Sequence, residues 1–366
     1  MINKIVFAAG GTGGHIYPAI AIADELKKLN EKIDIYFIGA RGKIEEKIIP
    51  SYGYRLKLID IRGFYRNTNL KNLVVLIKLA KSIRETKMFL REYKPEIVFG
   101  TSGYVSGPVL WAAHKLSILT GLIGGDFYPA VTTRMLSSKV DRLFLNFEES
   151  KKFFKRQDNI EIVHYPIRQN LKKYPREEAL KYFGLDGSKK TLFVFGGSQG
   201  ASSINKAMLK CIANITNENI QIIWQTGKND YEVVKERVRD NKFVKVYEYI
   251  ERIDYGYSAS DLIVCRAGIS TIMETAYYGG SVVFVPYPFA ANNHQEKNAL
   301  ALVNAEAAEM ILDKELDAKL CNTILRLMKN EHTSKTMGIN ISKFADQDAA
   351  SKIARELINI LNISKN

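Results

Sequence analysis

Short runs of apolar residues alternate along the chain with longer stretches that place apolar side chains at helical spacing. The first run, Lys4–Ala9, has the length of a buried strand, and apolar residues then recur every three or four positions up to Leu29. We expect this helix to span Pro18–Leu29, because the first helical turn tolerates a proline. Further strands are expected at Ile33–Ile38, Ile97–Phe99, Leu143–Asn146 and Ile160–Val163, with a loop rich in glycine and serine at Gly100–Gly107. This alternation predicts a parallel sheet covered by helices.

The same order of elements starts again in the second half of the chain. A strand is expected at Thr191–Phe195, a glycine-rich turn at Gly196–Gly200 and a helix at Ser202–Ala213. Further strands are expected at Gln221–Gln225, Phe243–Tyr247, Leu262–Val264 and Ser281–Val285. The fold class is therefore α/β, with two Rossmann-like, doubly wound domains.

The boundary between the two domains is expected in the polar, proline-containing stretch Tyr165–Pro175. We assign residues 1–165 to the first domain and residues 166–344 to the second. The last helix, near Ala349–Asn362, is expected to return to the first domain as part of segment 345–366.

Composition and charge exclude several classes of protein. The 366 residues are 46% hydrophobic and 25% charged, which is typical of a globular protein with a core and not of a disordered chain. Three cysteines, far apart and odd in number, provide neither a disulfide framework nor a zinc cluster and fit a reducing cytoplasm. No run of about 20 apolar residues predicts a membrane span.

The basic residues are unevenly distributed. The net charge is +14, and residues 1–165 hold 26 Lys and Arg against 16 Asp and Glu, a net charge of +10. An anionic membrane surface or a pyrophosphate-containing substrate would suit such a half, as would a solvated surface without any partner. Nucleic acid is not favoured, because only the net charge points to it.

Two glycine-rich turns each follow a strand and open a helix. The first, Gly10–His15, has glycine at four of its six positions, so its main-chain N–H groups can approach a ligand closely, and the helix behind it turns its positive end toward that ligand. It is neither the dinucleotide fingerprint nor a phosphate loop, and a tight turn without a ligand remains the alternative. His15, at the mouth of the helix, could act as a general base or have a structural role. The second turn, Gly196–Ala201, could hold a diphosphate with its N–H groups and the Ser198 hydroxyl.

Two further segments could contribute to a site. Cys265–Glu274 follows a strand, with Ser270 able to cap the next helix and Glu274 able to accept hydrogen bonds from ribose hydroxyls; both could equally be ordinary helix-start residues. Pro286–Asn298 is a loop at the carboxyl end of a strand, where open α/β folds bind ligands, and it carries His294 and Gln295.

Together these motifs resemble the MurG family, the peptidoglycan N-acetylglucosaminyltransferases that convert lipid I to lipid II. The resemblance covers nearly the whole chain and rests on motifs in the same order and at matching spacing. These are Gly-Gly-Thr-Gly-Gly-His at 10–15, Gly-Tyr-Val-Ser-Gly-Pro at 103–108, Gly-Gly-Ser-Gln-Gly-Ala at 196–201, the Cys-Arg-Ala-Gly run to Glu274, and His-Gln at 294–295.

The resemblance implies the glycosyltransferase B architecture, in which two domains face each other across a cleft. The second domain would bind UDP-N-acetylglucosamine, and the first would bind the acceptor, an undecaprenyl-diphosphate-linked muramyl peptide (lipid I). The donor residues implied are Arg168, Ser198, Gln199, Gly200, Ile250 (a backbone contact to uracil), Ile269, Ser270, Thr271, Ile272, Met273, Glu274 (on the ribose), His294 and Gln295 (on the sugar hydroxyls). The acceptor residues implied are Thr12, Gly13, Gly14, His15 and Tyr104.

The reaction implied is an inverting transfer. The 4-hydroxyl of the muramyl sugar attacks the anomeric carbon of the donor, His15 removes the proton, and UDP leaves with its charge stabilised by the second glycine turn and Arg168. No cofactor and no metal are expected. Asp346-Gln-Asp348 is interpreted as a helix cap and not as a metal site.

One stretch departs from the family pattern. Where the family commonly has His-Glu-Gln-Asn, this chain has Ile123-Gly124-Gly125-Asp126, interpreted as a loop. Asp126 then becomes an alternative to His15 as the base, if burial raised its pKa. The altered loop also keeps open the same donor chemistry on a different lipid-diphosphate sugar, and a donor-binding sensor without transfer. A sugar-nucleotide epimerase shares the two-domain fold but is disfavoured by the basic apolar segment described next.

The segment Leu70–Leu90 interleaves apolar residues with lysine and arginine, and Arg62-Gly-Phe-Tyr-Arg66 precedes it. Such a pattern suits docking on an anionic leaflet, although an amphipathic helix packed on its own sheet would look the same. We therefore expect a peripheral protein at the cytoplasmic face of the cell membrane.

Overall fold

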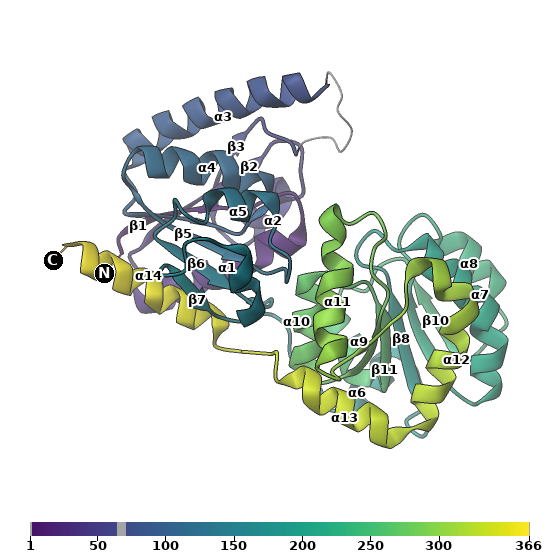
Figure 1. Cartoon of the computed structure of the whole chain (residues 1–366). Helices are drawn as coiled ribbons and strands as arrows, with labels where there is room; N and C mark the ends of the chain where they lie inside the picture. Colours follow the sequence, from purple (N-terminus) through teal and green to yellow (C-terminus); the bar gives the residue numbers. More distant parts are fainter. Residues whose placement is uncertain (1, 64–70, 366) are drawn as a thin grey trace. The chain divides into compact units, whose positions relative to one another are not determined.

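The strands of the computed structural model, which describes residues 2–63 and 71–365, form two separate parallel sheets (Figure 1). The chain divides into two units. Unit 1 holds the residues up to Gln169 and those from Asp346 on, and unit 2 is Asn170–Ala345. The division falls four residues after the expected boundary at 165, so Arg168 belongs to unit 1. Two doubly wound α/β domains are the fold class that the sequence predicts, and this prediction is confirmed.

The sheet of unit 1 has the order β3-β2-β1-β4-β5-β6-β7, with parallel neighbours throughout. Its strands are β1 (Lys4–Ala8), β2 (Asp34–Ala40), β3 (Arg55–Ile59), β4 (Ile97–Gly100), β5 (Leu119–Gly124), β6 (Arg142–Leu145) and β7 (Ile160–Ile162). Its helices are α1 (Gly13–Leu29), α2 (Glu45–Ser51), α3 (Lys71–Tyr93), α4 (Gly103–Lys115), α5 (Val131–Leu136), the 3-10 helix η1 (Glu148–Phe153) and α14 (Ala349–Lys365).

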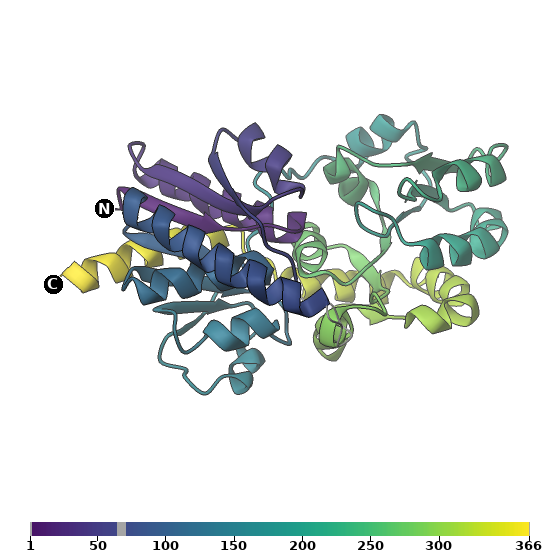
Figure 2. The same ribbon diagram turned by 90° about the horizontal axis from the view of Figure 1, so that it is seen from above.

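Helices cover both faces of this sheet, as Figures 1 and 2 show, with α3, α4 and α5 on one face and α1 and α14 on the other. A row of aromatic side chains crosses the second face. Phe7 stacks on Phe37 and meets the edge of Phe99, which in turn contacts Phe144 across β5. Gly121 of β5 permits the last contact, because a Cβ there would lie 2.7 Å from Phe99 and 3.0 Å from Leu357 of α14. The C-terminal helix therefore packs on the sheet of unit 1.

The sheet of unit 2 has the order β10-β9-β8-β11-β12-β13, again with parallel neighbours. Its strands are β8 (Thr191–Phe195), β9 (Gln221–Gln225), β10 (Val244–Tyr247), β11 (Leu262–Cys265), β12 (Ser281–Phe284) and β13 (Glu309–Met310). Its helices are α6 (Arg176–Phe183), α7 (Ser202–Asn217), α8 (Tyr231–Arg237), α9 (Ile253–Ala259), α10 (Ile269–Tyr278), α11 (His294–Asn304), α12 (Leu316–Lys329) and α13 (Glu331–Ser342), with 3-10 turns η2 (Ala291–Asn293) and η3 (Asp313–Glu315).

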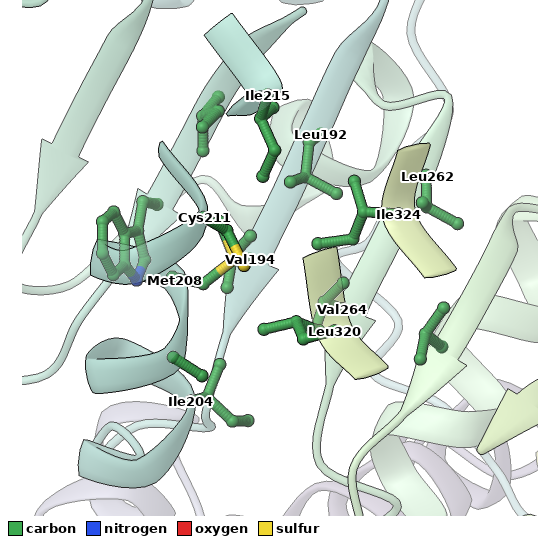
Figure 3. Close-up of a cluster of buried hydrophobic side chains, with 14 of the residues drawn as sticks. Leu192, Val194, Ile204, Met208, Cys211, Ile215, Leu262, Val264, Leu320 and Ile324 are labelled. Carbon is green, nitrogen blue, oxygen red and sulfur yellow. The ribbon is translucent and has the colours of Figure 1, made fainter. Parts of the chain in front are cut away.

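The core of unit 2 lies between its sheet and the pair α7 and α12. Figure 3 shows Leu192 and Val194 of β8 and Val264 of β11 facing Met208 of α7 and Leu320 of α12. All of these side chains are buried. The segments expected to carry the chemistry follow β8 and β11 directly.

Two sequence expectations about helix starts are wrong. Helix α1 begins at Gly13 and contains Pro18 in its interior, and α4 begins at Gly103, inside the expected loop Gly100–Gly107. Pro18 has no N–H to give to the carbonyl of Gly14, one helical turn earlier. The buried hydroxyl of Tyr165 donates to that carbonyl instead, at 3.0 Å. A residue from a distant part of the chain thus supplies the hydrogen bond that Pro18 cannot donate.

Other differences are smaller. Ile123 and Gly124, expected in a loop, form the end of β5. Strand β3 and helix α2 were not expected from the apolar pattern. Helix α3 covers most of the segment Leu70–Leu90, but Leu70 and residues 64–66 of the preceding basic stretch lie outside the described residues.

We predict that Tyr165→Phe destabilises the protein by about 1–2 kcal/mol, because the buried carbonyl of Gly14 loses its donor. In a Pro18→Ala background the same substitution should cost clearly less, since the introduced alanine supplies the intrahelical N–H. Calorimetric unfolding of the four proteins measures both losses. Equal losses in the two backgrounds would show that Tyr165 does not replace the missing bond.

Candidate functional site

Each sheet reverses its strand order once near its centre, between β1 and β4 in unit 1 and between β8 and β11 in unit 2. The loops after such a pair of strands diverge and leave a crevice at their carboxyl ends, where open α/β sheets bind ligands. The first glycine turn follows β1, and the second follows β8. The two glycine turns therefore lie at the switch points, one in each unit.

In unit 1 the first turn opens α1, and His15 is the third residue of that helix. Thr12 is the exposed N-cap, and Gly13 and Gly14 are the first helical residues, whose N–H groups no intrahelical carbonyl accepts. The His15 ring lies against Gly103 at the start of α4. A Cβ at Gly103, whose φ is +74°, would be 3.2 Å from the His15 Nε2. The two helix starts therefore meet at His15.

Tyr104 lies next to the same turn, on the other side. A Cβ at Gly11, whose φ is +88°, would be 2.9 Å from the Tyr104 Cε1. The Tyr104 hydroxyl is buried. Its pKa is raised, first by burial and then by the charge of Glu45, while Arg62 acts in the opposite direction. The phenol therefore stays protonated and can donate a hydrogen bond to a ligand oxygen.

Asp126 and Arg168 also lie in unit 1. The pKa of Tyr165 is raised by complete burial and, secondarily, by the charge of Asp126, so Asp126 lies near the bond from Tyr165 to Gly14. The guanidinium of Arg168 sits 5.3 Å from the ring centre of Tyr17, on α1. Arg168 therefore lies beside the first turns of α1, and Asp126 is near enough for its charge to act on Tyr165.

In unit 2 the second turn is built by close contact between backbones. Gly200 (φ +78°) presses on the loop after β9, because a Cβ there would lie 2.0 Å from the carbonyl oxygen of Thr226. Gly227 faces it reciprocally, with a φ of +78° and a Cβ position 2.4 Å from the carbonyl oxygen of Gln199. Ser198 and Gln199 are exposed at the tip of the turn. Gly227 is a residue that the sequence analysis missed, although its place after β9 could have indicated it.

Gln225 joins this turn to Ile250. Its buried side chain donates to the carbonyl of Gly197 at 3.0 Å, and its Oε1 accepts from the N–H of Ile250 at 2.9 Å. The Ile250 N–H is therefore engaged within the protein, and its carbonyl is the main-chain group left for a ligand. Sequence reasoning missed Gln225, because nothing in the strand pattern separates it from an ordinary strand end.

Helix α10 carries the run Ile269–Glu274. Glu274 is buried and accepts a hydrogen bond from the Tyr257 hydroxyl at 2.9 Å. The side chains of Ile272 and Met273 are buried, so only their main-chain atoms could reach a ligand. The sequence left open whether Ser270 caps this helix, and in the structure it does not. The N-cap is Gly268, and the Ser270 hydroxyl is buried in the first turn, where it has no hydrogen-bond partner among the described residues. Thr271 is half-buried in the same turn.

The segment 286–298, expected to be a loop, includes the 3-10 helix η2 and the first residues of α11, and His294 and Gln295 open that helix. The Oε1 of Gln295 accepts from the N–H of Tyr287 at 2.9 Å, and its Nε2 would lie 3.9 Å from a Cβ on Gly268. The Nδ1 of His294 pairs with the carbonyl of Ala291 at 2.9 Å. Gln295 therefore presents its amide beside the positive end of α10.

The Cys265 thiol and the Asp346 carboxylate can both be explained by their contacts within the protein. Burial and the charge of Glu274 raise the pKa of the Cys265 thiol, which is therefore protonated and a poor nucleophile. Asp346 accepts from the N–H of Asp348 and pairs with Lys352 at 2.6 Å, at the start of α14. The interpretation of Asp346-Gln-Asp348 as a helix cap stays a prediction.

Comparison with known families finds a match for each half of the chain. The glycosyltransferase family 28 N-terminal domain matches residues 5–145, and the family 28 C-terminal domain matches residues 191–353. A relative from Parabacteroides distasonis is 38% identical over 98% of both chains. It is named UDP-N-acetylglucosamine–N-acetylmuramyl-(pentapeptide) pyrophosphoryl-undecaprenol N-acetylglucosamine transferase.

Two solved structures are similar in fold. The crystal structure of Acinetobacter baumannii MurG has a TM-score of 0.79 at 23% identity and covers 98% of this chain and 99% of that one. The UDP-GlcNAc 2-epimerase from Neisseria meningitidis, bound to UDP-GlcNAc, has a TM-score of 0.69 at 14% identity and covers 97% of this chain and 100% of that one. Fold likeness at this level does not separate a transferase from an epimerase.

We predict that Gly227→Ala destabilises unit 2 by more than ~3 kcal/mol, because its Cβ would collide with the backbone of the second turn. Gly184→Ala is the matched control. Gly184 also has a positive φ, +63°, but nothing lies within 4 Å of its Cβ position, so only the backbone cost of about 1 kcal/mol applies. Calorimetric unfolding compares the two variants. A similar loss in both would contradict the close contact.

Proposed function

This chain belongs to glycosyltransferase family 28 and, within it, to the MurG family, and we propose that it transfers N-acetylglucosamine from UDP-N-acetylglucosamine to lipid I, giving lipid II. The observation that carries the proposal is the relative named for this activity, which is 38% identical over 98% of the chain. The two switch-point clusters supply groups suited to a donor and to an acceptor.

We assign the donor to unit 2. The second glycine turn and the start of α7 would hold the diphosphate, with Ser198, Gln199 and Gly200 in contact. Because Gln225 engages the Ile250 N–H, the Ile250 carbonyl would accept from the imide N–H of uracil. Glu274 would accept from ribose hydroxyls while it keeps the Tyr257 bond. Ile269–Met273 would line the nucleotide, and His294 and Gln295 would contact the sugar hydroxyls.

We assign the acceptor to unit 1. The muramyl sugar and its diphosphate would lie at Thr12–His15, whose helix start attracts an anion, with the protonated Tyr104 as a hydrogen-bond donor. Gly124, where the family commonly has a larger polar residue, is buried against Thr133 and offers no side chain. That difference keeps a variant lipid-diphosphate sugar open as the acceptor.

The chemistry is a displacement with inversion. The 4-hydroxyl oxygen of the acceptor sugar forms a bond to the anomeric carbon as the bond from that carbon to the UDP oxygen breaks, and UDP leaves with the electron pair. The hydroxyl proton passes to His15, or to Asp126 in the alternative we retain. The second turn, the start of α7 and Arg168 would stabilise the charge on UDP, so we assign no metal or cofactor to the step.

The membrane surface is the remaining partner. None of the described helices is long and apolar enough to span a bilayer. The first turns of α3 nevertheless expose a cluster of apolar side chains, Leu73, Val74, Leu76 and Ile77, of which Ile77 is 63% exposed. Later residues of the same helix, Leu79, Ile83 and Phe89, pack on the unit 1 core. The exposed cluster, followed by Lys78, Lys81 and Arg84, supports docking on the anionic cytoplasmic leaflet that holds the acceptor.

Transfer is tested with purified protein, UDP-N-acetylglucosamine and a lipid I analogue. We expect UDP release that depends on the analogue, and a product carrying one added N-acetylhexosamine by mass spectrometry. His15→Ala should lower kcat by about 100-fold or more, as loss of a general base does, and Asp126→Asn should lower it less. The reverse order would assign the base to Asp126. Donor binding without transfer would favour the sensor, and conversion of the donor alone would favour an epimerase.

Membrane docking is tested by sedimentation with vesicles that contain phosphatidylglycerol. Val74→Ser with Ile77→Ser should weaken binding about tenfold, because two exposed apolar side chains no longer enter the leaflet. The control pair, Val233→Ser with Ile339→Ser, removes equally exposed apolar side chains from unit 2 and should change nothing. Equal binding by both pairs would contradict docking through α3.

A further inference from the structure

Glu45 is a carboxylate with no exposed surface, in the first turn of α2. Both of its oxygens accept from the N–H of Gly11, at 3.1 Å each, and Oε1 also accepts from the N–H of Ala40 at 2.9 Å. Three backbone contacts thus compensate a charge that would be very costly to bury alone. They join α2 and the end of β2 to the first glycine turn.

Two glycines make room for this side chain. A Cβ at Gly10 would lie 2.2 Å from Oε1 of Glu45, and a Cβ at Gly39 would lie 2.7 Å from its Cγ. Real Cβ atoms do not approach so closely, so both positions must be bare. The carboxylate therefore lies between the ends of β1 and β2, where both of its oxygens reach the N–H of Gly11.

The position of Gly11 determines where the groups around it lie. Tyr104 packs against Gly11, and the chain then continues directly through Thr12 into the helix that carries His15. The charge of Glu45 contributes to raising the pKa of Tyr104, so the two groups are close. A shift of Gly11 would therefore move both the phenol and the start of α1.

We propose that Glu45 is a positioning residue of the acceptor half. It holds the Gly11 N–H inward, so that the first turn presents Tyr104 and His15 and cannot use that N–H to cradle a phosphate. The inference rests on the proposed function, since it assigns the acceptor to unit 1. Glu45 touches no substrate and acts through Gly11.

The first test is a comparison of steady-state kinetics. Glu45→Gln keeps the size of the side chain but removes its charge. With the amide oxygen in the place of Oε1, the amide NH2 takes the place of Oε2 and opposes the N–H of Gly11. Glu46→Gln is the matched control, because Glu46 is the next residue of α2, is exposed, and accepts only from Gly42 at 2.7 Å among the hydrogen bonds of the described residues. We expect Glu45→Gln to lower kcat/KM for the lipid I analogue about tenfold, with KM for UDP-N-acetylglucosamine within about twofold of wild type. Glu46→Gln should match wild type.

The second test does not depend on turnover. Hydrogen exchange of the substrate-free protein should be faster at the amide of Gly11 in Glu45→Gln than in wild type or Glu46→Gln, with the segment 191–200 unchanged. Glu45→Asp, which keeps the charge but withdraws the oxygens by one bond, should also expose Gly11, and it serves if Glu45→Gln does not fold.

The outcomes separate the two proposals. Unchanged exchange at Gly11 overturns the positioning role, and so does a variant that loses thermal stability but affects donor and acceptor kinetics equally. If the wild type transfers sugar to no lipid acceptor, the proposed function fails. The positioning role in the acceptor half then falls with it, and faster exchange would establish only that Glu45 holds the turn.

Discussion

The structure depends on the reversal of strand order at the centre of each parallel sheet. At that point two neighbouring strands end side by side and their connections leave in opposite directions, so the backbone must turn sharply into a helix within a few residues. Glycine is needed there because the turns use positive φ and because backbones approach one another closely, as Gly200 and Gly227 do. The locations of the two sites therefore follow from the strand topology, and the particular side chains are carried on that framework.

The sequence predicts the elements whose causes are local. Strands β8 and β9 have the bounds expected from their apolar runs, and the switch-point turns lie where the glycines indicate. Helix α1 begins five residues before the expected Pro18 because Tyr165, far along the chain, donates to the carbonyl that the proline leaves. Helix α4 begins within the expected loop, after Ser102 takes a φ of +62° that its bonds to Ile123 and Thr133 support. Such contacts are made by the fold and are not visible in a local pattern.

The candidate site divides in the same way. The motif residues could be found from the sequence, because glycine spacing and helix starts are written in it, and the family resemblance that they carry is confirmed by the match over both halves of the chain. The residues that support the motifs could not be found from the sequence. Gln225 looks like any strand end and Glu45 like any first-turn carboxylate, and only the folded backbone brings their oxygens to Ile250 and Gly11. Ser270 shows the opposite case, since its residue type suits a cap but the structure places it two residues after the N-cap Gly268.

The contrast between the two glycine turns is more informative than their likeness. Each follows the first strand of its unit and opens a helix, so each could attract an anion in the same way. In the first turn a buried carboxylate already holds the Gly11 N–H, and its negative charge opposes a phosphate at that point. In the second turn the supporting side chain is the neutral amide of Gln225, which donates to the carbonyl of Gly197, as the N–H of Gly200 also does. Among the hydrogen bonds of the described residues, none uses the N–H of Ser198 or Gln199. An acceptor diphosphate at the first turn is therefore left with the N–H groups at the start of α1, at Gly13 and Gly14, and not with that of Gly11. A nucleotide diphosphate at the second turn meets no supporting carboxylate, which fits the assignment that the family resemblance implies for the donor.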